Sequence, residues 1–270
     1  RDRRARRNLR AKGVYGPVSV DRLSGTSLPY IDNFVNLVVA EESLGVSADE
    51  VLRVLCPNGV GYLKQNGEWT KLVKPWPQDI DDWTHYFHDS TGNPVAHDRV
   101  VDAPERLQWV GSPRWSRHHD RMASMSALVS AKSRMTYIMD EGSRISIQLP
   151  SKWQIVSRDG FNGTILWKRP IAKWHNQMWP LKSGPTQLAR RLVADDEHVY
   201  VTMGIKDPVS RPDAATGKTE LVYESTKGAE EIVLSNGVMF TLVNAKESEL
   251  DEFAPKLNTG ASLVRKVKKI

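Results

Sequence analysis

The sequence predicts an α/β piece at the N-terminus, residues 1–74, followed by an all-β region, residues 104–250. The first part alternates strand, helix and strand, which is the rhythm of a parallel α/β unit. The second part holds many short β runs separated by turn residues, and one turn phrase occurs there twice. Residues 75–103 are then a linker and lead-in to the β region, and residues 251–270 form a charged tail.

The elements of the N-terminal piece follow from local signals. They are a helix at 3–12, strands at 18–20, 34–40 and 60–63, and a helix that opens at Ser47. Gly13 supplies a stop for the first helix. Ser47 and Glu50 have the spacing of a capping box, which starts the second helix. The nearly continuous apolar run at 34–40 predicts a strand buried on both faces.

The pattern changes around Lys74. Pro75 and Pro77 break the chain, and helical periodicity almost disappears after Trp83, so we place a domain boundary near residues 74–82. Short β runs follow at 107–110, 136–139, 153–156, 165–167, 198–202, 231–234 and 238–243. These runs predict several short strands of an all-β domain.

The repeated phrase is a hairpin turn. It reads Asp159-Gly-Phe-Asn-Gly163 at its first occurrence and Asp213-Ala-Ala-Thr-Gly217 at its second, 54 residues later. Gly at the end of the turn supplies a positive φ, and the Asp side chain at the start can bond backbone amides two residues on. The repetition predicts recurring four-stranded sheets. Trp167, four residues after Gly163, is placed to lie between neighbouring sheets.

These phrases carry a family resemblance. Residues 158–167 and 213–218 resemble the blade motif of quinoprotein-like β-propellers, which bind pyrroloquinoline quinone. The longer runs DDWTHYFHDSTGNPVAHD, LQWVGSPRWSRHHD, MASMSALVSA, DEGSRISIQLPSKW and KSGPTQLARRLVA resemble large planctomycete-type bacterial proteins. Those proteins carry such a propeller behind a class I methyltransferase-like domain. The resemblance covers about residues 10–243.

The resemblance implies that residues 1–74 are the second half of a Rossmann-like methyltransferase domain. The glycine-rich turn of the S-adenosylmethionine site would lie upstream of Arg1. Ser24 and Asn36 stand at two cofactor-binding positions where the family has acidic residues. The resemblance therefore implies a degenerate half site that binds S-adenosylmethionine poorly.

The resemblance also implies an incomplete propeller. Its blades would span 136–167 and 192–223, with a third starting near Glu231. Such a propeller leaves sheet edges open, which predicts self-association. The chain would then be a fragment or a truncated relative. The family suggests a periplasmic location, although the sequence itself leaves the compartment unknown.

Histidines cluster in the lead-in and shortly after it, since five of the seven fall between His85 and His119. His85 and His88 are three residues apart, and His97 could complete a metal site with them. Three aspartates directly follow a histidine: Asp89, Asp98 and Asp120. The alternative is that such His-Asp pairs are structural and satisfy buried turn backbone.

Aromatic and basic residues supply further candidates. Trp174, His175 and Trp179 fall in a predicted loop and are candidate cofactor-binding residues on which a quinone could stack. The tryptophans in predicted strands are expected to pack sheets together. Four arginines could pair an acidic ligand or could be solvated or paired across strands: Arg114, Arg117, Arg190 and Arg191.

We expect a binding or scaffold module with no catalytic residues assigned. The alternatives are a methyltransferase that uses S-adenosylmethionine once its first half is supplied, and a quinoprotein oxidoreductase that uses pyrroloquinoline quinone with Ca²⁺; neither cofactor has a complete site. The sequence lacks hydrolase, zincin and P-loop motifs. The charge of +6 resides at the two ends, which argues against nucleic-acid binding. No run is apolar and long enough for a transmembrane segment.

Overall fold

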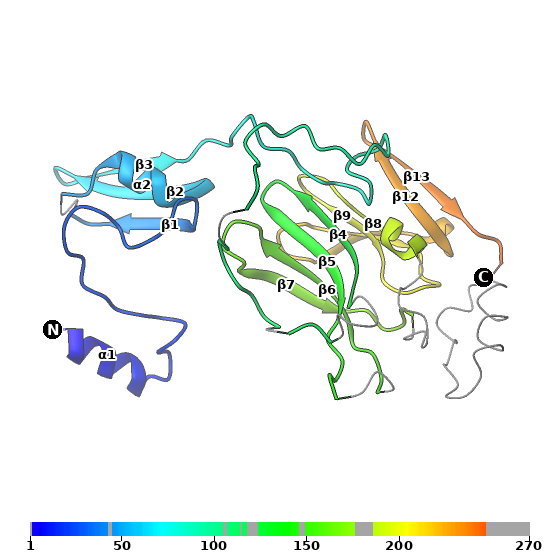
Figure 1. Cartoon of the computed structure of the whole chain (residues 1–270), viewed down its shortest axis with the longest axis horizontal. Coiled ribbons are helices and arrows are strands. Elements are labelled where there is room, and N and C mark those ends of the chain that lie inside the picture. Colours follow the sequence, from blue (N-terminus) through cyan, green and yellow to red (C-terminus); the bar gives the residue numbers. More distant parts are fainter. Residues whose placement is uncertain are drawn as a thin grey trace. The chain divides into compact units, whose positions relative to one another are not determined.

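The computed structural model describes residues 2–42, 45–104, 107–113, 115–117, 124–145, 149–175 and 186–246. The chain separates into two compact units, residues 1–77 and residues 78–270 (Figure 1). Most of its regular structure is β-sheet, and the described residues contain two α-helices.

The first unit is built around a three-stranded sheet. Its elements are α1 (Asp2–Ala11), β1 (Val35–Ala40), α2 (Ala48–Val54), β2 (Leu55–Gln65) and β3 (Glu68–Val73). The strand order is β1-β2-β3, with β1 parallel to β2 and β3 antiparallel to β2. The Ser47 hydroxyl caps α2 by accepting a hydrogen bond from the Glu50 amide at 3.1 Å, as its spacing predicts.

The predicted Rossmann-like half is wrong. Residues 18–20 form no strand and contribute only an isolated bridge between Tyr15 and Val18. The apolar run of β1 is not buried on both faces, because Leu37 and Val39 are 55% and 59% exposed. A Rossmann sheet is parallel and carries helices on both faces. This unit has one crossover helix and an antiparallel hairpin instead.

The second unit contains three small antiparallel sheets. The first has the order β4-β5-β6-β7 and the second the order β11-β10-β9-β8, so each follows the chain strand by strand. The third pairs β12 with β13. The strands are β4 (Met125–Ala131), β5 (Arg134–Asp140), β6 (Trp153–Asp159), β7 (Ile165–Pro170), β8 (Leu192–Ala194), β9 (Val199–Thr202), β10 (Val209–Pro212), β11 (Thr219–Tyr223), β12 (Ala229–Ser235) and β13 (Val238–Val243). Two 3-10 helices, η1 (Thr186–Arg191) and η2 (Glu224–Thr226), complete the unit.

The predicted propeller is also corrected. The described residues form no closed propeller but a series of small sheets. Two four-stranded sheets and one two-stranded sheet supply too few strands to close a ring of blades, which takes at least four four-stranded sheets. The predicted strand at 107–110 is absent as well, since these residues have no strand conformation.

The repeated turns join neighbouring parts of the second unit. The indole of Trp167, on β7, donates to the Ala214 carbonyl at 2.8 Å and covers Gly217. The indole of Trp109 donates to the Gly160 carbonyl at 2.9 Å and covers Gly163 in the same way. A Cβ on either glycine would come within 2.4 Å of the indole ring. Each turn therefore requires its glycine for two reasons: the positive φ and the space that the indole occupies.

Candidate metal centre

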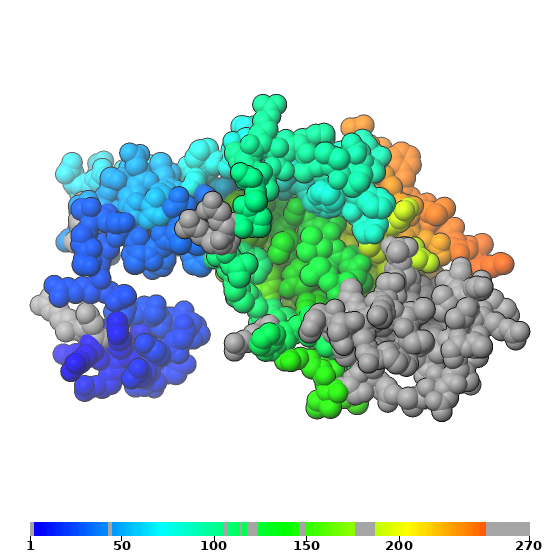
Figure 2. Space-filling view, in the orientation of Figure 1, coloured from blue at the N-terminus to red at the C-terminus, as the bar shows by residue number. Residues whose placement is uncertain are grey.

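The lead-in holds the three sheets of the second unit together. The Trp83 carbonyl accepts from the Ser130 amide on β4 at 2.7 Å, and the Thr84 carbonyl accepts from the Ala194 amide on β8 at 3.0 Å. The ring of His85 accepts from the Leu234 amide on β12 at 3.0 Å. Figure 2 shows the lead-in, in blue-green, lying across the surface of this unit. Three consecutive residues thus bond to three different sheets.

His85 forms one of these hydrogen bonds and is not a metal ligand. Its Nε2 accepts the Leu234 amide, so its Nδ1 carries the proton and donates to the Thr84 hydroxyl at 2.8 Å. Burial lowers the pKa of this imidazole, which favours the neutral ring that the two bonds require. Both ring nitrogens are used inside the protein.

His88 lies on the far side of a tight turn. The His85 amide donates to the His88 carbonyl at 3.0 Å, and His88 takes a left-handed φ of 66°. A non-glycine residue in this conformation costs about 1–3 kcal/mol, so the surrounding turn must hold His88 in place. The turn directs the His88 side chain inward, where it is 2% exposed and packs edge-on against Trp83.

Asp81 selects the tautomer of the His88 ring when that ring is neutral. Its Oδ2 accepts from His88 Nε2 at 2.7 Å and from the His97 amide at 2.6 Å. Burial by itself would raise the pKa of Asp81, but the hydrogen bonds from His97 and His88 outweigh it and lower the pKa. An ionised Asp81 holds the proton on Nε2 and leaves the lone pair on Nδ1. This is the carboxylate–histidine arrangement that orients metal-binding imidazoles.

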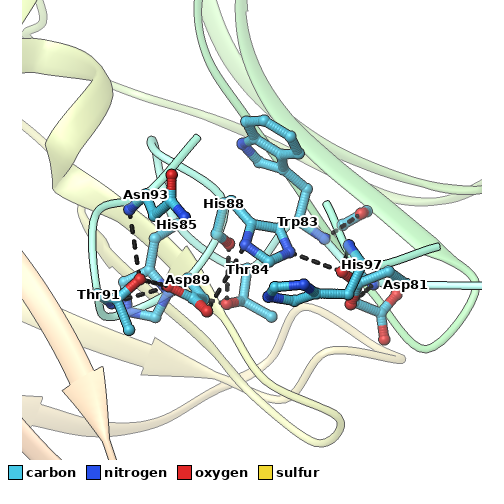
Figure 3. Close-up of polar contacts among 11 residues, drawn as sticks. Asp81, Trp83, Thr84, His85, His88, Asp89, Thr91, Asn93 and His97 are labelled. Carbon is cyan, nitrogen blue, oxygen red and sulfur yellow. Dashed lines mark hydrogen bonds and ion pairs between the residues drawn. The ribbon is translucent and has the colours of Figure 1, made fainter. Parts of the chain in front are cut away.

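Two further side chains, Asp89 and His97, converge on that lone pair (Figure 3). A ligand atom from each of His88, Asp89 and His97 lies within 4.8 Å of the others. His88 Nδ1 is buried, makes no hydrogen bond, and lies 3.6 Å from Asp89 Oδ2. Ligands of a tetrahedral zinc ion are about 3.4 Å apart, given Zn–N bonds of about 2.0–2.1 Å. The His88–Asp89 spacing already fits, and the exposed His97 ring has room to move closer.

Asp89 and His97 differ in how firmly they are held. The other carboxylate oxygen of Asp89 accepts from the Thr91 amide at 2.8 Å and from the Thr91 hydroxyl. These Thr91 bonds lower the pKa of Asp89, so Asp89 is a carboxylate near neutral pH. The backbone of His97 is anchored by Asp81, whereas its ring makes no hydrogen bond within the described residues.

A cavity of about 220 Å³ borders the cluster. Asp89 belongs to both, and the opposite wall carries Arg190 and Glu231, which form an ion pair at 2.9 Å. The Arg190 guanidinium also lies over the Phe87 ring at 5.7 Å. A ligand in this cavity would therefore meet an aromatic ring, an ion pair and the carboxylate of the candidate metal site.

Two of the three predicted metal ligands lie together in the structure. Two more residues belong to the site, Asp89 and Asp81, which the histidine spacing did not identify. His88 and His97 come together, while His85 points to β12. In the sequence, Asp89 stands out only as an aspartate that directly follows a histidine. The role of Asp81, seven positions before His88, had no signal in the sequence because it depends on how the loop folds back.

The other predicted site residues lie elsewhere. Ser24 is exposed in a loop, and Asn36 donates to Cys56 Sγ at 3.3 Å. Trp174 is buried in the main core, with its indole donating to Ser126, and the His175 ring packs on Trp153 at 4.6 Å. That these residues bind a cofactor stays a prediction. Trp179, with Arg114, His118, His119 and Asp120, lies outside the described residues.

None of the helices in the described part of the chain has the length and apolar character needed to cross a membrane. No protein-family model matches the chain, and no curated protein sequence matches it.

Proposed function

We propose that this chain is a binding or scaffold module of repeated β-sheets that holds a divalent transition-metal ion, zinc in the first place, at His88, Asp89 and His97. One observation carries the proposal. A buried imidazole nitrogen, His88 Nδ1, has no hydrogen-bond partner, although a carboxylate fixes its tautomer from the other side. A buried polar atom without a partner costs about 1–3 kcal/mol, and a metal ion would remove that cost.

The choice of zinc follows from the ligand types. Two imidazoles and one carboxylate suit zinc, because imidazole favours zinc, copper, iron and nickel over calcium and magnesium. Three protein ligands leave a fourth position for water or a bound group. The adjacent cavity at Asp89 is where such a group would come from.

The scaffold part of the proposal rests on how the second unit is assembled. Trp167 joins two four-stranded sheets, and the lead-in bonds to all three sheets. A metal ion at His88 and His97 would fasten the lead-in itself, since both residues belong to it. The metal would then stabilise the junction on which the sheets depend.

We also propose that the module self-associates through open sheet edges. Strand β13 pairs only with β12 in the described part of the chain, and it exposes Val238, Phe240 and Leu242 on one side. An exposed, apolar edge strand is a template for a second copy. Sedimentation velocity should show a concentration-dependent dimer that Phe240→Lys abolishes; a monomer at all concentrations would remove this part of the proposal.

The methyltransferase and quinoprotein alternatives rested on the fold classes corrected above. No observation on the described residues favours either activity.

The test is zinc titration of the full chain after metal removal, in competition with a chromophoric chelator. His97→Ala keeps the backbone bond to Asp81 and removes only the ring, so it should fold and bind zinc at least about tenfold more weakly. Asp81→Asn should weaken binding by about 10–100-fold through the tautomer of His88.

His198→Ala is the matched control, because it removes a histidine that hydrogen-bonds Glu220 away from the cluster. Its zinc affinity should equal that of the unmodified chain. Equal zinc affinity of His97→Ala and His198→Ala would overturn the metal site while leaving the scaffold proposal intact.

A further inference from the structure

A second cavity of about 200 Å³ lies in the second unit, away from the histidine cluster. Four segments line it: the end of η1, the loop after β9, the start of β12 and the residues after β13. The lining residues are Arg191, Ile205, Lys206, Lys227, Gly228, Glu230, Asn244, Ala245 and Lys246. Four of them are cationic and one is anionic, so the lining carries a strong positive charge.

Arg191 is the unusual member of this lining. It is 1% exposed and is the largest fully buried side chain in the described part of the chain. Its Nη1 donates to the Ile205 carbonyl at 2.7 Å. Its Nε is buried without a hydrogen-bond partner, and none of its atoms is ion-paired within the described residues. A buried guanidinium in this condition is costly, because burial removes its water and no carboxylate compensates.

Glu230 does not play the compensating part. Its carboxylate accepts from the Asn244 side chain at 3.0 Å, and it reaches Arg191 only as a nearby charge. Lys227 and Lys246 add to the positive field of the cavity. Among the described residues that line it, Glu230 is the one carboxylate.

We infer that this cavity binds a phosphate-class oxyanion. The planar N–H donors of a guanidinium match two oxygens of such an anion, and lysines add point charges from the cavity rim. The volume admits a phosphate group with a small substituent. The same chemistry could come from free inorganic phosphate or from a phosphate monoester, and the experiment separates these two sources.

The experiment is calorimetric titration of the full chain with inorganic phosphate, O-phosphoserine and acetate at matched ionic strength. Phosphate should bind and acetate should not. Tighter binding of O-phosphoserine would assign the site to a phosphate monoester, and tighter binding of inorganic phosphate would assign it to the free ion. Equal binding of acetate and phosphate would overturn the inference, because it would show a diffuse charge effect.

Two variants and one control locate the site. Arg191→Met should weaken phosphate binding at least about tenfold, and Lys227→Gln, at an exposed position, should weaken it several-fold without affecting folding. Lys218→Gln makes the same charge change at an exposed lysine outside the cavity and should leave affinity within about twofold. If Lys227→Gln and Lys218→Gln bind phosphate equally well, the inference is wrong even if Arg191→Met fails to fold.

Discussion

Two buried arginines show two ways in which a protein can keep a charge inside. The side chains of Arg117 and Asp140 are both fully buried and pair at 2.6 Å. Arg117 also donates to the carbonyls of Ser143 and Leu149 and to the Ser151 hydroxyl. Arg191 is buried to a similar degree but makes one hydrogen bond.

The difference teaches which buried charges belong to the fold and which point to a ligand. All three nitrogens of the Arg117 guanidinium are used by the chain, so it fastens Ser143, Leu149 and Ser151 to the end of β5. Arg191 has an unused edge and lines a cationic cavity. The same contrast separates His85, whose two nitrogens are both bonded, from His88, whose Nδ1 is not.

The largest expected effect comes from Asp140→Asn. It removes the buried carboxylate that pairs with the Arg117 guanidinium at 2.6 Å, which should cost about 3–5 kcal/mol of unfolding free energy. Urea denaturation would measure it. The control is Asp196→Asn, which removes an exposed ion pair with Lys132 and should cost at most about 1 kcal/mol. Equal losses in the two variants would mean that burial of the Arg117 pair does not matter.

Arg191→Met should cost much less in phosphate-free buffer. The change removes a costly charge and one hydrogen bond, so we expect a loss of about 1–2 kcal/mol from the Ile205 carbonyl left without its donor. Phosphate at a hundred times its Kd should stabilise the unmodified chain by about 2.7 kcal/mol and the variant hardly at all. A loss as large as that of Asp140→Asn would place Arg191 with the structural arginine instead.

The pH dependence of stability should report on His85. Burial lowers the pKa of His85 in the folded chain, so below about pH 6.5 the unfolded chain takes up a proton first. Stability from His85 is therefore present above that pH and is lost as the pH falls. His85→Gln retains an acceptor for the Leu234 amide and should flatten this slope in urea denaturation between pH 5 and 7. An unchanged slope would contradict the neutral, doubly bonded imidazole.

The smallest effect is expected for Glu230→Gln. It removes the one carboxylate found among the described residues that line the Arg191 cavity, while keeping an acceptor for Asn244. Stability should change by at most about 0.5 kcal/mol, and phosphate affinity measured by calorimetry should rise a few-fold because a like charge is gone. Weaker phosphate binding in this variant would argue that Glu230 helps to hold the ligand.

The sequence predicted the local backbone structure well, but it predicted poorly which faces of the sheets are covered by other elements. The backbone conformation of the repeated turns was predictable because the residues that set it lie within five positions. Asp159 and Asp213 accept backbone amides at 2.8 Å, and Gly163 and Gly217 have φ near +70°. The run at 34–40 predicts a strand buried on both faces, but an apolar composition cannot show whether a second layer covers the sheet, and the strand is partly exposed.

The histidine cluster was predictable in part for a related reason. The spacing of His85, His88 and His97 indicated a site, but it could not separate a ligand from a structural bond. The partner of His85 is Leu234, 149 positions away, and no local pattern indicates such a contact. The Arg191 cavity had even less signal, since its walls come from four segments that meet only in the folded chain.

The docking of tryptophan on a glycine turn has a consequence for how such a chain can grow by duplication. The first four-stranded sheet carries both halves of the contact, a turn that receives an indole and a last strand that offers one four residues later. A copied segment of this kind brings its own means of attachment to the original. The second sheet has the turn, but at the position matching Trp167 it has Leu221, which is exposed. The sheets are therefore joined in chain order, and the docking of a strand tryptophan on the next glycine turn is not continued from β11.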